Sequence, residues 1–123
     1  MLKTILYIAL GGAIGSVFRY LTIVLVSKYW PENFPLATLI ANITGCFLIG
    51  LFFGFLAKNQ LQDSNLKWFL VTGLCGGYTT FSAFGMENYN LLQNNNSLLA
   101  FAYIALSVIL GIFAVWFGLW VSK

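Results

Sequence analysis

The sequence predicts an all-α membrane protein with four transmembrane helices per subunit, the third of them broken. Of its 123 residues, 60% are hydrophobic and only 7% are charged, whereas about 25% of the residues in a soluble domain are charged. The hydrophobic residues fall into four blocks long enough to cross a bilayer, which takes about 20 apolar residues each. These blocks use nearly the whole chain, so we expect a single transmembrane domain, residues 1–123. Four helices this short enclose little by themselves, and we expect the chain to oligomerise.

The predicted spans cover approximately residues 4–26, 36–57, 68–92 and 98–121. In the first span Gly11 and Gly15 have a GxxxG spacing, and Gly50 and Gly54 repeat this spacing in the second. Small residues at this spacing let another helix approach closely. We therefore expect both spans to pack tightly against neighbouring helices.

The third span contains the stretch that the other spans are organised around, residues 72–88, and this stretch is a poor membrane helix. Gly73, Gly76 and Gly77 each cost roughly 1 kcal/mol against alanine in a helix interior. Hydroxyl residues follow the glycines, and Glu87 comes shortly after them. Irregular backbone at membrane depth is tolerated only where protein or a watery cavity satisfies its polar groups, and interrupted helices mark binding sites in transporters. The stretch therefore predicts a broken helix that builds an ion site.

The charges predict the orientation only weakly. An even number of spans places both termini on one side of the membrane, and the basic residues then divide as Lys3, Lys58, Lys67 and Lys123 against Lys28 and Arg19. Positive side chains favour the cytoplasm, and this division slightly favours a cytoplasmic N-terminus. It is also compatible with insertion in both orientations. Tryptophan is enriched at the lipid headgroups, near the ends of membrane spans. Three tryptophans lie near predicted span ends: Trp68, Trp116 and Trp120.

Several function classes are disfavoured by composition. The chain has no histidine, the commonest general base and metal ligand. Cys46 and Cys75 lie inside apolar segments with no CxxC or metal spacing, so we interpret them as buried apolar side chains. Paired carboxylates are also missing, and we do not expect an enzyme. The net charge of +3 is scattered with no basic run, so nucleic-acid binding is not expected.

Polar residues in the first two spans each have a structural and a functional interpretation. Arg19 either extends its guanidinium to the membrane surface or faces an aqueous mouth that gathers anions. Thr38 and Asn42 are four residues apart and share one helical face. The amide of Asn42 either hydrogen-bonds a neighbouring helix or offers its two donors to an anion.

Hydroxyl groups in the last two spans suggest a continuous polar track. Tyr103 and Ser107 repeat the four-residue spacing in the fourth span, and Ser82 follows the break in the third. Each residue alone is weak evidence. Together they could line a path for an ion.

Two phenylalanines and one acid follow the break. Phe81 and Phe84 share a face, and such rings usually pack or face lipid, although their electropositive edges can also attend an anion. Glu87 lies on the same side of the helix. A carboxylate in a membrane is expensive and indicates a functional site, with a helix-packing hydrogen bond as the alternative.

Three motifs then become recognisable. They are GxxxGSxxRY (11–20), PxxTLxxNxxG (35–45) and TGxxGGxTTFSxF (72–84). In this order they closely resemble the Fluc (CrcB) fluoride channels, and the resemblance covers essentially the whole chain. It implies a dual-topology, antiparallel homodimer with two pores in the cell inner membrane. Such a channel exports fluoride passively from the cytoplasm and relieves fluoride toxicity.

The resemblance also implies roles for particular residues. Phe81 and Phe84 match the pore phenylalanines, Asn42 the pore-lining amide and Arg19 the vestibule arginine. The polar track is matched by Thr38, Ser82, Glu87, Tyr103 and Ser107. A structural sodium ion at the dimer centre is implied, held by backbone carbonyls that here would belong to Gly76 and Thr79 of each subunit. Unwound helices present such carbonyls to cations.

The sequence departs from the family pattern at a few positions. Ala83, Gly85 and Gly111 lack hydroxyls that some members carry, and Tyr78 replaces an aliphatic residue. Two rival functions remain open, a proton-coupled small-molecule exporter of the small multidrug type and a non-transporting membrane subunit. Such exporters keep a glutamate in the first span, where this chain has Arg19 and no acid.

Overall fold

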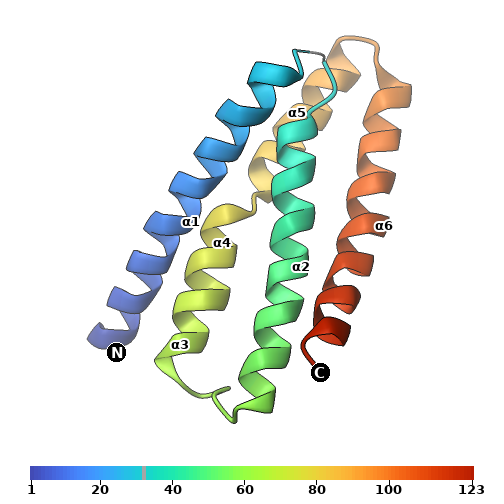
Figure 1. The fold of residues 1–123 in the computed structure, drawn as a ribbon. Helices are drawn as coiled ribbons and strands as arrows, with labels where there is room; N and C mark the ends of the chain where they lie inside the picture. Colours follow the sequence, from blue (N-terminus) through green and yellow to red (C-terminus); the bar gives the residue numbers. More distant parts are fainter. Residues whose placement is uncertain (32) are drawn as a thin grey trace.

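The described residues, 1–31 and 33–123, contain helices and no strand in the computed structural model. The helices lie side by side in a bundle, with both termini at the same end (Figure 1). In chain order the elements are α1 (Leu2–Tyr29), α2 (Leu36–Lys58), α3 (Asn65–Lys67), the π-helical segment η1 (Trp68–Cys75), α4 (Gly76–Tyr78), α5 (Phe81–Gln93) and α6 (Ser97–Val121). The prediction of an all-α protein is confirmed.

Three of these helices, α1, α2 and α6, are long and apolar enough to cross a membrane. They cover the first, second and fourth of the ranges that hydropathy marked as spans. The chain is therefore a multi-pass membrane protein. Its helices extend beyond the marked ranges by no more than a few residues at either end, because helical hydrogen bonding continues into the interface where hydropathy falls.

The third of these ranges has a different structure. From α3 through η1 to α4 the backbone is helical, and then Thr79 and Thr80 are extended, with ψ angles of 159° and 121°, before α5 begins. The helix is interrupted two residues after Gly77, and Gly76 itself has ordinary helical angles (φ −62°, ψ −38°). The glycines therefore do not break the helix where they stand.

Close packing against α1 explains these glycines. A Cβ atom on Gly73 would lie 2.9 Å from the Cα atom of Gly11, and one on Gly77 would lie 2.6 Å from the carbonyl oxygen of Gly12. On the other side of the contact, a Cβ on Gly11 would collide with the carbonyl oxygen of Phe69. The glycines of both segments thus let α1 lie directly against η1 and α4.

A second close contact joins α2 to α6. A Cβ atom on Gly50 would collide with the carbonyl oxygen of Val115, and one on Gly118 would collide with the carbonyl oxygen of Phe47. Gly54 faces Ser122 in the same way. The close approach expected from the two GxxxG spacings is confirmed, and the partners are η1 for α1 and α6 for α2.

The hydrophobic core is small and lies around α5. Leu39, Leu91, Ala100 and Tyr103 are buried together, and Phe84 packs against them. By contrast α1 buries only Gly11 and Gly15, and most of its large apolar side chains are exposed. Of the cysteines, Cys75 is buried as expected and Cys46 is half-buried, and both are free thiols. The outer surface is thus suited to lipid or to another chain.

Candidate functional site

The interruption at Thr79 and Thr80 is held by a side chain from α2. The amide of Asn42 accepts a hydrogen bond from the Thr80 backbone N–H at 2.8 Å and donates one to the Thr80 carbonyl at 3.1 Å. Extended residues inside a helical segment leave backbone groups without helical partners, which is costly away from water. Asn42 satisfies both groups of Thr80, so the hydrogen bond to a neighbouring segment, one of the two interpretations of this amide, is present. One N–H of its amide remains for another acceptor.

The two threonines complete the geometry of the interruption. Thr80 is the N-cap of α5, and its hydroxyl accepts a hydrogen bond from the Ala83 N–H at 3.2 Å. Thr79 donates its hydroxyl to the Cys75 carbonyl at 2.9 Å, closing the end of the preceding helix. Sequence reasoning grouped Thr80 with the other hydroxyls and missed its capping role. The signal was present, since threonine before a helix is a preferred N-cap.

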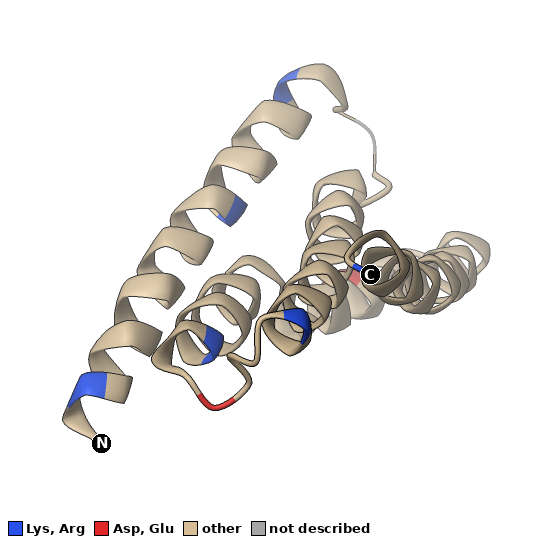
Figure 2. Cartoon of the chain, turned by 60° about the horizontal axis from the view of Figure 1, so that its bottom comes forward, with Lys and Arg blue, Asp and Glu red and all other residues tan. Residues whose placement is uncertain are grey.

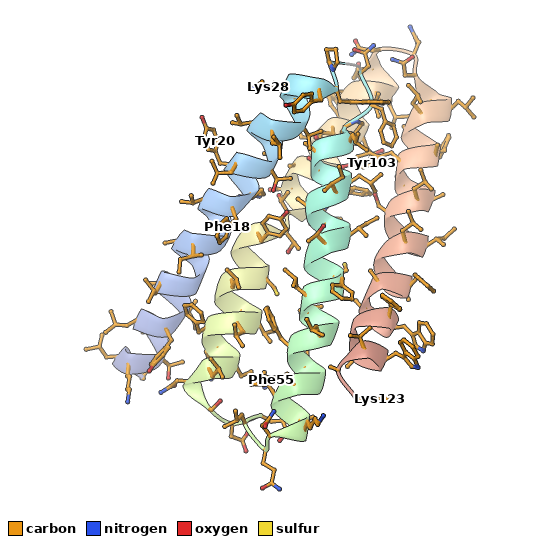
Figure 3. The ribbon with its side chains drawn as sticks, viewed as in Figure 1. Phe18, Tyr20, Lys28, Phe55, Tyr103 and Lys123 are labelled. Atoms are coloured by element: carbon orange, nitrogen blue, oxygen red, sulfur yellow. The ribbon has the colours of Figure 1, made fainter. Side chains whose placement is uncertain are left out.

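A carboxylate joins three helices close to this interruption. Glu87 on α5 accepts hydrogen bonds from the Thr38 hydroxyl of α2 at 2.8 Å and from the Tyr103 hydroxyl of α6 at 3.1 Å. Tyr103 is fully buried and lies where these helices meet in the upper part of the bundle (Figure 3). The packing hydrogen bond considered for Glu87 is therefore present. Three residues of the expected polar track are in direct contact.

The aromatic rings form a row beside these polar groups. The centroids of Phe81 and Phe84 are 5.7 Å apart, and those of Phe84 and Tyr103 are 5.0 Å apart. Phe84 is partly buried against the core, whereas Phe81 is 83% exposed. Phe34, which the sequence did not single out, packs edge-on against Tyr103 at 5.5 Å. The row thus begins at the core and ends at the outer surface of the chain.

Two cavities adjoin the row of rings. The first, of 380 Å³, is bordered by the interruption, by both phenylalanines and by residues Asn42, Gly76 and Ser107. The hydroxyl oxygen of Ser107 is buried there and has no hydrogen-bond partner among the described residues. The second cavity, of 780 Å³, is bordered by Thr38 and Glu87 and by four amide side chains, Asn90 of α5 and Asn33, Asn94 and Asn96 of the connections at this end of the bundle. Polar groups thus border both cavities, the first at Phe81 and Phe84 and the second at Phe34.

Two candidate residues lie apart from these cavities. Arg19 is partly exposed on α1, and it is not among the described residues that line either cavity. Ser82 is exposed on α5 and shares a hydrogen bond of 3.2 Å with the hydroxyl of Thr80. A single chain therefore gathers most of the predicted residues and leaves Arg19 separate.

Comparison with known proteins shows the family of the chain. A family model described as CrcB-like protein, Camphor Resistance (CrcB), matches residues 6–119. The chain belongs to the CrcB family. This CrcB chain is 60% identical to a protein of Flavobacterium psychrophilum over 122 residues, which is 99% of this chain and 98% of the relative. That relative is named fluoride-specific ion channel FluC.

Two further relatives of the CrcB chain carry the same name. A protein of Campylobacter fetus is 50% identical over 98% of this chain and 94% of its own length. A protein of Azobacteroides pseudotrichonymphae is 42% identical over 96% of this chain and 94% of its own length. Both matches extend over nearly the full length of the two proteins.

Proposed function

We propose that this CrcB chain is a fluoride-selective ion channel, not an enzyme, and that it lets fluoride leave the cytoplasm passively. The observation that carries the proposal is the interruption at Thr79 and Thr80, which is held open by Asn42 and faces a cavity lined by Phe81 and Phe84. This arrangement supplies uncharged donors and ring edges, and none of the described residues that line the cavity has a charged side chain. It occurs in a chain 60% identical to a protein named fluoride-specific ion channel FluC.

The chemistry of this site suits a small, strongly hydrated anion. A selective pore must replace the water around the ion with donors while each site stays weak enough for the ion to leave. Such donors are the second amide N–H of Asn42 and the hydroxyl of Ser107, which has no hydrogen-bond partner among the described residues. The electropositive ring edges of Phe81 and Phe84 add a weak attraction for the anion.

We propose a path that runs through the whole set of candidate residues. Fluoride enters at a mouth where Arg19 concentrates anions, then passes Asn42 and the ring edges. It next meets the hydroxyls of Ser82 and Ser107. Around Thr38, Glu87 and Tyr103 the hydroxyl donors already bond the carboxylate, so these donors must turn from Glu87 to the ion as it passes.

The assembly in this proposal is an antiparallel homodimer with dual topology and two pores, located in the cell inner membrane. Residues 65–93 act as one interrupted third span, which makes four spans per subunit. Two observations support a dimer. Phe81 is 83% exposed although it lines the candidate path, and Arg19 lies apart from the other candidates, so a second subunit is needed to enclose both.

A structural sodium ion at the dimer interface fits the backbone of the interruption. Thr79 has left the helix, so its carbonyl is not committed to a helical hydrogen bond. Gly76 is exposed, and a Cβ atom there would find its nearest neighbour only at 3.8 Å, so the surrounding space is open. Carbonyl oxygens from Gly76 and Thr79 of two subunits would hold the ion. Its charge would fix the irregular backbone on both sides of the interface.

Proton-coupled export of small molecules is the second candidate function. It would use Glu87 as the proton-binding group, yet this carboxylate is held by two hydroxyl donors inside the helix bundle. The first span offers no acid in its place. A non-transporting subunit is a third candidate, and the polar groups that the chain keeps at membrane depth argue against it, since such groups are expensive there.

Fluoride efflux from proteoliposomes tests the proposal. Purified protein is reconstituted into vesicles loaded with fluoride, and release is read with a fluoride electrode after the membrane potential is clamped. Matched vesicles loaded with chloride are the control. Rapid release of fluoride without release of chloride is expected. If well-folded dimers release neither ion, the channel is excluded, and proton-driven uptake of organic cations is measured next.

A further inference from the structure

The C-terminal half of α6 carries a ladder of four aromatic rings on its outer face, Phe113, Trp116, Phe117 and Trp120. The ring centroid of Phe113 lies 5.6 Å from that of Trp116 and 6.2 Å from that of Phe117, whose ring plane is only 6° from its own. The centroids of Phe117 and Trp120 are 5.9 Å apart. The rings are nevertheless 39–56% exposed. The ladder is thus ordered by its own contacts and open on one side.

The ladder runs along α6 from its C-terminal end toward the middle of the helix. Trp120 lies one residue before the end of α6, at the level where tryptophan favours the headgroup region. Phe113 lies seven residues earlier, about 10 Å deeper at 1.5 Å per residue. Phe117 is also anchored against Phe47 of α2, with centroids 5.7 Å apart. The rings therefore cover the depth of a lipid's glycerol and upper acyl chain.

Two lysines lie at the headgroup end of this ladder. Lys58 ends α2 and Lys123 follows α6, and both are exposed. The two helices touch at Gly54 and Ser122, one turn from Lys58 and next to Lys123, so the ammonium groups emerge from the same helix pair. Basic residues gather at this end of the bundle, which carries both termini, and an acidic segment is visible among them (Figure 2). The charge here favours an anionic partner.

We propose that the ladder together with Lys58 and Lys123 forms a binding site for an anionic phospholipid, with phosphatidylglycerol as the probe. The lipid phosphate binds between the two ammonium groups, and one acyl chain lies along the exposed rings. Charge complementarity selects an anionic lipid over a neutral one. The attraction of one lysine near the membrane surface for anionic lipid corresponds to roughly fivefold in affinity. The lipid site uses no residue of the proposed ion path, so it can be tested independently of the proposed channel activity.

Fluorescence quenching by brominated lipid tests the site. The variant Trp30→Phe/Trp68→Phe keeps only Trp116 and Trp120 as emitters, and it is placed in nanodiscs of phosphatidylcholine with a minor share of phosphatidylglycerol. Bromine is carried either by the phosphatidylglycerol or by an equal share of the phosphatidylcholine. We expect brominated phosphatidylglycerol to quench several-fold more strongly than its share predicts. Adding Lys58→Gln/Lys123→Gln removes the preference, whereas Lys28→Gln on α1 leaves it intact.

Two results would overturn the site. Equal quenching by the two brominated lipids would mean that the lysines select no headgroup. Quenching by neither lipid would mean that a second copy of the chain covers the rings. Native mass spectrometry of the unaltered protein is the independent measurement if the tryptophan variants do not fold. It should retain phosphatidylglycerol over phosphatidylcholine, and the preference should fall in Lys58→Gln/Lys123→Gln but persist in Lys28→Gln.

Discussion

The amide of Asn42 bonds both the N–H and the carbonyl of Thr80, at 2.8 and 3.1 Å. This pair of hydrogen bonds connects α2 to the interruption between α4 and α5. It also shows why an irregular backbone is stable here, since one side chain replaces two helical partners. In the proposed channel, Asn42 therefore both lines the ion path and stabilises the interrupted backbone.

Replacing Asn42 with alanine should destabilise the protein and impair fluoride release. Each buried backbone group left without a partner costs roughly 1–3 kcal/mol, and Asn42→Ala abandons two of them. Thermal unfolding of the detergent-purified protein and fluoride efflux are the measurements. Asn59→Ala is the matched control, because Asn59 makes a single exposed hydrogen bond to the carbonyl of Phe55. Unchanged stability of Asn42→Ala would contradict the supporting role.

Replacing Phe81 with isoleucine should cut fluoride efflux sharply and leave stability nearly unchanged. The side chain is 83% exposed in the single chain, so little packing is lost, while isoleucine has no electropositive ring edge. Efflux and size-exclusion chromatography are measured side by side. Phe101→Ile on α6, where the ring is 65% exposed, serves as the control and should conduct normally. Normal flux through Phe81→Ile would eliminate the ring-edge role.

The Phe84→Ile variant should behave differently from Phe81→Ile. Phe84 is packed into the core with its centroid 5.0 Å from that of Tyr103. We expect both a loss of flux and a loss of stability, because large-to-small changes in a core typically remove packing that the site does not recover. Denaturation of the two variants under identical conditions makes the comparison. Equal stabilities would show that the partly buried ring packs no better than the exposed one.

Tyr103 and Glu87 should be energetically coupled. Their hydrogen bond is 3.1 Å long and the tyrosine is fully buried, and residues in contact typically show coupling energies of roughly 0.5–3 kcal/mol. The cycle uses Tyr103→Phe, Glu87→Gln and the double variant, with unfolding free energies measured for each. Tyr89→Phe replaces Tyr103→Phe in the control cycle, since Tyr89 is 56% exposed on the same α5 helix as Glu87. Strict additivity for Tyr103 would refute the contact.

Adjacent glycines in α1 should respond in opposite ways to alanine. A Cβ on Gly11 would collide with the backbone of Phe69, whereas a Cβ on Gly12 would find its nearest neighbour at 3.9 Å. Gly11→Ala should therefore destabilise by roughly 1–3 kcal/mol through overpacking. Gly12→Ala should be neutral or more stable by up to about 1 kcal/mol from helix propensity. Thermal unfolding of the two variants measures the difference. Equal stabilities of the two variants would mean that α1 does not pack this closely.

Sodium should stabilise the dimer if the carbonyls of Gly76 and Thr79 hold it. A ligand that binds only the folded state adds about 1.4 kcal/mol per site for each tenfold rise above its dissociation constant. Melting curves are recorded as sodium replaces N-methylglucamine at constant ionic strength. Replacing chloride with gluconate is the control and should have no effect. A melting temperature that does not change with sodium concentration would contradict the proposed sodium site.

Helix content and the membrane setting followed from the sequence alone. Long apolar blocks can satisfy their backbone in lipid only as helices, so α1, α2 and α6 were predictable from hydropathy. The GxxxG spacings in the first two spans also predicted close packing, because a missing Cβ is a local property. Motif order was enough to indicate the CrcB family.

Tertiary structure alone decided where the helical segment of residues 65–93 is interrupted, and why. Gly73 and Gly77 looked like helix breakers, yet they remain helical because α1 occupies the space that their missing side chains leave. The interruption falls instead at Thr79 and Thr80, where Asn42 from another helix supplies the partners that local sequence cannot. The hydrogen bonds from Thr38 and Tyr103 to Glu87 could not be predicted from the sequence for the same reason. Hydrogen bonds between distant segments depend on how helices pack, and no local pattern records that packing.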